Sequence, residues 1–227
     1  RMGVEFMTDC IVGKTLSYDD LHEMGFKGIM VASGAGLPRF MNIPGENLNG
    51  VMSSNEYLTR VNLMDAANPD SDTPVWRGRR VAVIGGGNTA MDSVRTARRL
   101  GAEKVMIIYR RSEDEMPARK EEIHHAKQEG VEFLTLHNPV EYIGDGRVCQ
   151  MRLQKMELGE PDASGRRSPV PIPGAIETID IDEVIVSVGV SPNPLVPNSI
   201  EGLEVTPKGT IVVNADTLQS SIPDIYA

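Results

Sequence analysis

Short apolar runs alternate with stretches of helical periodicity through the middle of the chain. Three runs have the length and β-branched character of buried strands: Arg80–Ile84, Lys104–Tyr109 and Val131–Leu136. Two amphipathic stretches of helix length separate them: Asn88–Leu100 and Pro117–Glu129. Gly101 and Gly130 follow these stretches at once, as glycines do where helices end. Strands that alternate with helices predict an α/β fold with a parallel sheet.

The flanking regions predict further elements. Towards the N-terminus we expect a strand at Val4–Val12, a helix at Tyr18–Met24 and a strand at Lys27–Ser33. Strands near Glu141–Ile143, Val148–Glu157 and Ile176–Ile181 predict an antiparallel excursion, with the Gly/Pro-rich segment 159–174 as its long turn. The apolar run Asp182–Val188 then predicts one more buried strand.

The clearest candidate site is the glycine-rich segment after the strand Arg80–Ile84. Gly85, Gly87 and Ala90 fit the pattern G-x-G-x-x-A between a strand and a helix. The first glycine permits the tight turn, the second lets the backbone approach a pyrophosphate, and the small third residue allows the helix to pack on the sheet. The helix N-terminus offers free N–H groups to the phosphates. The predicted dinucleotide-binding residues here are Gly85, Gly86, Gly87, Asn88, Thr89 and Ala90.

The end of the next strand indicates which dinucleotide binds. NAD sites usually carry an Asp or Glu there for the ribose 2′-hydroxyl. Here Tyr109 is followed by Arg110 and Arg111, and the first carboxylate is Glu113. Guanidinium groups can hold a 2′-phosphate through paired hydrogen bonds. The sequence therefore favours NADPH over NADH.

Composition narrows the choice of partners. The formal net charge of −9 argues against nucleic acid, whose binding rests on neutralising phosphates. The longest apolar runs are shorter than the roughly 18 residues that cross a bilayer. Cys10 and Cys149 lie far apart in no C-x-x-C pair, so a cytoplasmic setting without disulfides is expected. No Ser/His/Asp or metal-binding pattern stands out, and we predict no catalytic side chain and no metal site.

Several motifs together are similar to a known family. The segment 85–92, the run Tyr109-Arg110-Arg111 and the run Met116-Pro117-Ala118 resemble the NADPH half of the glutamate synthase small (β) subunit family. That family includes the larger subunit of NADH-dependent ferredoxin:NADP oxidoreductase and the flavin-containing part of dihydropyrimidine dehydrogenase. The runs 34–39 and 43–47 look most like the stand-alone bacterial and archaeal members of that family, and the segment 188–193, with Gly189, matches their return crossing between the two domains. The resemblance covers essentially the whole chain.

The resemblance implies a Rossmann-like NADPH-binding domain, residues 46–190, inserted in an FAD-binding domain formed by residues 1–45 and 191–227. An internal echo agrees, because Gly3-Val4-Glu5-Phe6 recurs as Gly130-Val131-Glu132-Phe133. The family's FAD glycine loop would precede Gly3 and its flavin-contacting segment would follow Ala227, so we expect a piece that lacks both FAD-binding ends.

The implied reaction is hydride exchange between NADPH and FAD, with electrons passing on through iron–sulfur centres. The partner would be a large glutamate synthase subunit or a ferredoxin-linked subunit, and an electron-bifurcating role stays open. Two other classes remain: a free-standing dehydrogenase, for which no catalytic His, Lys or Tyr stands out, and a nucleotide-binding module without enzymatic activity.

Overall fold

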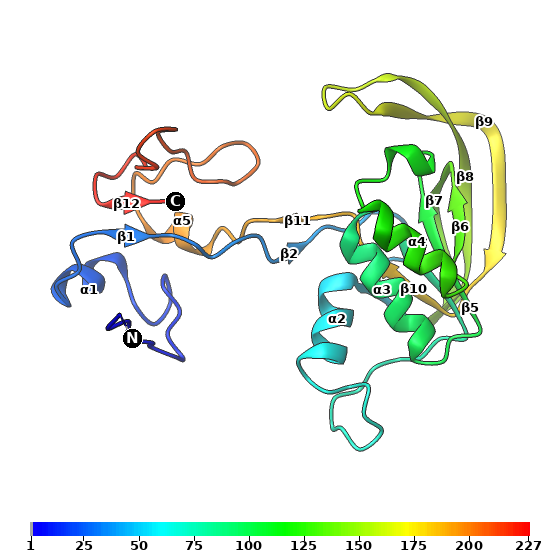
Figure 1. Ribbon diagram of the computed structural model, residues 1–227, viewed down its shortest axis with the longest axis horizontal. Coiled ribbons are helices and arrows are strands. Elements are labelled where there is room, and N and C mark those ends of the chain that lie inside the picture. Colours follow the sequence, from blue (N-terminus) through cyan, green and yellow to red (C-terminus); the bar gives the residue numbers. More distant parts are fainter. Residues whose placement is uncertain (1) are drawn as a thin grey trace. The chain divides into compact units, whose positions relative to one another are not determined.

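The chain forms two compact units in a computed structural model that describes residues 2–227 (Figure 1). Unit 2 is the continuous stretch Pro38–Gly189, and unit 1 combines Arg1–Leu37 with Val190–Ala227. The chain passes from one unit to the other twice, and the two connecting segments pair as the short strands β2 (Leu37–Pro38) and β11 (Val190–Ser191). Unit 2 carries all the predicted nucleotide-binding residues.

Unit 2 is built on a five-stranded parallel sheet in the order β3-β10-β4-β5-β6. Its strands are β3 (Val51–Ser53), β4 (Arg80–Ile84), β5 (Lys104–Tyr109), β6 (Glu132–Thr135) and β10 (Glu183–Val186). From β4 the chain proceeds outward to β5 and β6, and it returns on the other side as β10. The order of strands therefore reverses at β4, where open α/β sheets bind ligands beyond their carboxyl ends.

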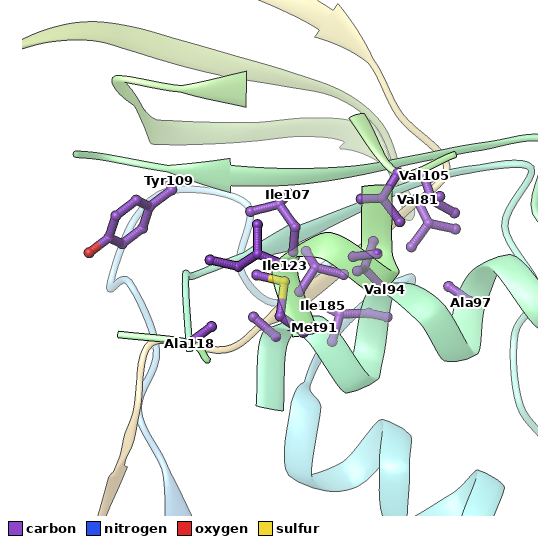
Figure 2. Packing of buried hydrophobic residues seen from close by; sticks show 14 of the residues in the cluster. Val81, Met91, Val94, Ala97, Val105, Ile107, Tyr109, Ala118, Ile123 and Ile185 are labelled. Carbon is purple, nitrogen blue, oxygen red and sulfur yellow. The ribbon is translucent and has the colours of Figure 1, made fainter. Parts of the chain in front are cut away.

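Helices cover one face of this sheet. They are α2 (Ser54–Asn62), α3 (Asn88–Arg99) and α4 (Lys120–Gln128). The side chains that meet in this core alternate along the strands and recur every three or four positions along the helices, and Figure 2 labels ten of them: Val81, Met91, Val94, Ala97, Val105, Ile107, Tyr109, Ala118, Ile123 and Ile185. Because successive side chains of a strand point to opposite faces, these alternate positions bury the helix-covered face of the sheet.

The opposite face is covered by a three-stranded antiparallel sheet in the order β7-β8-β9. Its strands are β7 (His137–Asp145), β8 (Arg147–Pro161) and β9 (Arg167–Asp180). The intervening positions of the parallel strands, Ala82 and Ile84 in β4 and Met106 and Ile108 in β5, pack against buried residues of this sheet. Unit 2 is thus a three-layer α/β/β domain, and the predicted α/β class is confirmed.

Unit 1 has a smaller core. Its elements are α1 (Tyr18–Glu23), β1 (Ile29–Met30), α5 (Leu195–Ser199) and β12 (Ile225–Tyr226), and β1 pairs with β12 in parallel. Ile200, Leu203 and Ile225 are its buried apolar residues. Ser17 begins α1 with a capping box that includes Asp20. Within residues 2–227, no helix has the length and apolar character needed to cross a membrane.

Several predicted elements are wrong in their extent. The segment 4–12 forms no strand and is largely exposed, because no described segment supplies the hydrogen-bonded neighbour that a strand needs. The predicted long turn 159–174 is mostly strand, with Leu158 opposite Pro169, and only residues 162–166 turn. Three prolines of this segment, Pro169, Pro171 and Pro173, lie on β9, an edge strand, where a missing N–H is tolerated.

One buried carboxyl group lies at the opening of β10. Glu183 is 1% exposed; its Oε2 accepts a hydrogen bond from the Gly78 amide at 2.8 Å. Its Oε1 has no hydrogen-bond partner within residues 2–227. Burial raises the pKa of Glu183 to about 7, above the ordinary value of 4.5. Between these two pH values the folded chain holds a proton that the unfolded chain loses, so the stability falls as the pH rises.

We therefore expect Glu183→Gln to stabilise the protein at pH 8 and to change it little at pH 5. Glutamine keeps the acceptor for Gly78 and cannot ionise. The gain in free energy of unfolding at pH 8 is expected to be about 1–3 kcal/mol, from the size of the pKa shift. Denaturant unfolding of both proteins at the two pH values measures it; an equal difference at pH 5 and pH 8 would contradict the titration of Glu183.

Candidate functional site

The predicted phosphate loop lies between β4 and α3, at the carboxyl edge of the parallel sheet. Gly85 donates its amide to the carbonyl of Ile108 at 3.0 Å, which ties the loop to the end of β5. Gly87 is the N-cap of α3 in an extended conformation, and no side chain caps the helix. Strand, glycine turn and helix therefore follow one another as the motif predicts.

The three glycines do different work. Gly85 has a φ of +139°, and a Cβ there would lie 2.2 Å from the carbonyl oxygen of Ser187. A Cβ at Gly86 would lie 2.9 Å from the ring of Tyr109. A Cβ at Gly87 would meet nothing within 4 Å. The first two glycines are thus required by protein packing, whereas the space beside Gly87 is open to a ligand.

The N-terminus of α3 offers donors for an anion. Within residues 2–227 the backbone N–H groups of Gly87, Asn88 and Thr89 have no acceptor. The first turn of the helix contains no acidic residue. Ala90, by contrast, is fully buried and donates to the carbonyl of Gly87 at 3.0 Å. Free amides and the positive end of the helix dipole together form a phosphate-binding arrangement.

The segment 117–119, directly before α4, forms hydrogen bonds with this loop. Ala118 donates its amide to the carbonyl of Gly86 at 3.1 Å, and Arg119 donates its amide to Oδ1 of Asn88 at 2.9 Å. These contacts explain why α4 begins at Lys120, three residues after the predicted start. Sequence reasoning missed this role of the segment, because Pro117 also suits the first turn of a helix.

The two arginines after β5 have different environments. Arg110 is exposed, and no residue in the described part of the chain pairs with it. Arg111 is 6% exposed; its Nη2 donates to Oδ2 of Asp162 at 2.6 Å and its Nε to the carbonyl of Arg167 at 2.7 Å. Of the predicted pair, only Arg110 is thus available to bind a 2′-phosphate without breaking contacts within the protein.

Gly189 lies at the end of the loop that follows β10. Its φ is +107°, and its carbonyl accepts the amide of Arg39 at 3.0 Å. The same loop contains Ser187, whose carbonyl lies against Gly85. The loop after β10 therefore runs beside the phosphate loop. Among residues 2–227 there is no group of three or more His, Cys, Asp or Glu side chains that could hold a metal ion.

Comparison with known sequences gives one family and several relatives. The pyridine nucleotide-disulphide oxidoreductase family matches residues 2–227. The glutamate synthase [NADPH] small chain of Halomonas elongata is 38% identical over 93% of this chain and 45% of its own length. The NADP(+)-dependent formate dehydrogenase subunit beta of Moorella thermoacetica is 36% identical over all of this chain and 31% of its own length. The resemblance to glutamate synthase small subunits is confirmed, and the chain spans about half of such relatives or less.

Solved structures show the same fold. FprA from Mycobacterium tuberculosis superposes with a TM-score of 0.75 at 22% identity, over 96% of this chain and 60% of that one. Thioredoxin reductase from T. acidophilum gives a TM-score of 0.62 at 19% identity, over 88% of this chain and 56% of that one. The predicted α/β fold with a Rossmann-like parallel sheet is therefore confirmed.

Proposed function

Because the chain belongs to the pyridine nucleotide-disulphide oxidoreductase family, we propose that residues 46–190 bind NADPH and serve a flavin-dependent oxidoreductase. The observation that carries the proposal is the open face of Gly87 beside amides that have no acceptor within residues 2–227. A pyrophosphate needs close backbone approach and free N–H donors, and this loop offers both.

Each predicted residue except Arg111 has a task in this proposal. Gly87, Asn88 and Thr89 donate backbone N–H groups to the pyrophosphate, and the helix dipole of α3 adds to the attraction. Gly85, Gly86 and Ala90 let the loop and helix pack closely on the sheet, and Gly189 borders the site from the loop after β10. Arg110 pairs with the 2′-phosphate, the group that distinguishes NADPH from NADH. NADPH supplies a hydride when it is bound, and we assign no catalytic side chain to that step.

Residues 1–45 and 191–227 form, in this proposal, part of an FAD-binding domain. Unit 1 supports this through the apolar side chains that it leaves exposed, among them Met2, Val4 and Phe6. A domain of ordinary size would cover a set of this kind. No residue of unit 1 is assigned to the flavin.

The whole protein would transfer electrons between NADPH and a partner subunit. Support comes from the names of the relatives, which are a small chain and a beta subunit. A large glutamate synthase subunit and a ferredoxin-linked subunit both stay candidates, and a cytoplasmic setting stays the expectation. The iron–sulfur centres rest on the resemblance alone and stay a prediction. A nucleotide-binding module without enzymatic activity is the alternative, and it would bind NADPH without reducing any flavin.

Arg110→Ala tests the assignment of the cofactor. The variant is expected to weaken NADPH binding about 10- to 100-fold, which is the loss of charge-assisted hydrogen bonds to the 2′-phosphate. NADH binding should change little, because NADH has no 2′-phosphate. Dissociation constants of both nucleotides for the full-length protein measure this difference.

Arg79→Ala is the matched control. Arg79 is an exposed arginine that forms an ion pair with Glu103 at 2.8 Å. It directly precedes β4, so it lies at the amino ends of the parallel strands, away from the candidate site at their carboxyl ends. It should leave both dissociation constants unchanged. Equal losses of NADPH and NADH in Arg110→Ala would contradict the 2′-phosphate assignment.

A further inference from the structure

The turn between β8 and β9 is bound to the end of β5 by one arginine. Arg111 bridges more than 50 residues of sequence to reach it, through the 2.6 Å ion pair with Asp162 and the 2.7 Å hydrogen bond to the carbonyl of Arg167. The Arg111 side chain is 7% exposed and that of Asp162 is 30% exposed. Figure 1 shows this hairpin, β8 and β9, extending past its neighbouring strands.

The turn has a fixed local shape. Asp162 donates its amide to the carbonyl of Arg166 at 2.7 Å, and its Oδ1 accepts the amide of Ser164 at 2.8 Å. Hydrogen bonds from Ser164, followed by the amide of Arg166 and the charge of Arg111, hold the pKa of Asp162 below its ordinary value. The hydrogen bonds within the turn therefore orient the carboxylate towards Arg111 and favour its ionised form.

Arg111 lies just beyond the carboxyl end of β5, at the same end of the parallel strands as the candidate site. Arg111 follows Arg110 directly, and its carbonyl accepts the amide of Leu136 at 3.0 Å. The carbonyl of Leu136 in turn accepts the amide of Met156 in β8 at 2.8 Å. Backbone and side chain of Arg111 thus both connect the hairpin to the carboxyl end of β5.

We infer that Arg111 is a positioning residue, which fixes the 162–166 turn as one wall of the 2′-phosphate site and leaves contact with the phosphate to Arg110. For Arg111 to bind the phosphate itself, it would have to leave Asp162 and the carbonyl of Arg167. Arg111 is buried and Asp162 is partly exposed, and separating them would leave the guanidinium group and the carboxylate without their charge partners. The inference rests on the proposed NADPH site and assigns separate tasks to its two arginines.

Asp162→Asn distinguishes the two roles of Arg111, because they predict opposite effects. If Arg111 positions the hairpin, Asp162→Asn and Arg111→Ala should each weaken NADPH binding by a similar factor of about 3 to 10. The double variant should be no weaker than either single variant, since both remove the same contact. NADH binding should change less than NADPH binding in all three.

If Arg111 contacts the phosphate directly, releasing it from Asp162 would leave NADPH binding unchanged or tighten it, whereas Arg111→Ala would weaken it strongly. That result overturns the inference. Hydrogen exchange of residues 157–170 serves as the second readout. Faster exchange in Asp162→Asn with an unchanged ratio of NADPH to NADH affinity would make the contact merely structural, and would overturn the inference as well.

Two controls accompany the experiment in the full-length protein. Glu141→Gln removes the ion pair of Glu141 with Arg152, 2.7 Å long, between β7 and β8 and away from the turn. It should leave both affinities unchanged. Arg110→Ala and the wild type separate the two proposals. If the wild-type protein binds NADPH no more tightly than Arg110→Ala does, and neither prefers NADPH to NADH, the proposed function fails. If these two proteins behave as expected and only Asp162→Asn does not, this inference alone fails.

Discussion

Gly87→Ala is expected to fold like the wild-type protein and to lose NADPH and NADH binding alike, by about 100-fold, equivalent to about 2.8 kcal/mol. The fold should tolerate the change, because a Cβ at Gly87 meets no protein atom within 4 Å and its φ of −90° suits any residue. The added methyl group would occupy the space in which the backbone approaches the pyrophosphate.

The measurement combines thermal unfolding without ligand with nucleotide titration. An unfolding temperature close to that of the wild type, together with the loss of both nucleotides, is the expected pair of results. Unchanged affinity in Gly87→Ala would show that the open space beside α3 is not where the pyrophosphate binds.

Gly85→Ala, two positions away, is expected to fail in the opposite manner, through folding. The residue has a φ of +139°, and its Cβ would lie 2.2 Å from the backbone oxygen of Ser187. Backbone strain of roughly 1–3 kcal/mol and overpacking of about 1–3 kcal/mol should together lower the free energy of unfolding of unit 2. Neither cost depends on a ligand.

Denaturant unfolding without nucleotide measures this loss, with Gly101→Ala as the matched control. Gly101 also has a positive φ, of +101°, but a Cβ there meets nothing within 4 Å. The control should therefore show the strain without the clash. A Gly85→Ala variant as stable as Gly101→Ala would contradict the close contact between the phosphate loop and the loop after β10.

Local sequence determines the part of the site that could be predicted. The turn from β4 into α3 needs glycine at Gly85 for its φ and at Gly86 for its contact with Tyr109. Such requirements are met by residue type alone, so a short pattern reveals them. The end of α3 follows from Gly101, and the extent of β5 follows from the continuous apolar run Val105–Tyr109, all of whose residues are buried.

Long-range contacts determine what could not be predicted. The pairing of Arg111 with Asp162 depends on the β8–β9 hairpin, and the Gly/Pro content of residues 159–174 had indicated a loop there instead of strands. Helix α2 was missed although Ser53 and Glu56 lie three residues apart, a spacing typical of a helix N-terminus. The segment 4–12 has strand composition, but within residues 2–227 its one β-bridge is the isolated pair Val12 with Leu16, and composition alone does not supply a neighbouring strand.

Unit 2 is expected to bind NADPH at the phosphate loop in preference to NADH. Calorimetric titration of the full-length protein with each nucleotide, at one moderate salt concentration, tests it most directly, since ionic strength alters contacts with phosphate. We expect one site per chain and tighter binding of NADPH by about 10-fold or more, from the contact between Arg110 and the 2′-phosphate. Equal affinities would contradict the role of Arg110, and binding of neither nucleotide would contradict the site itself.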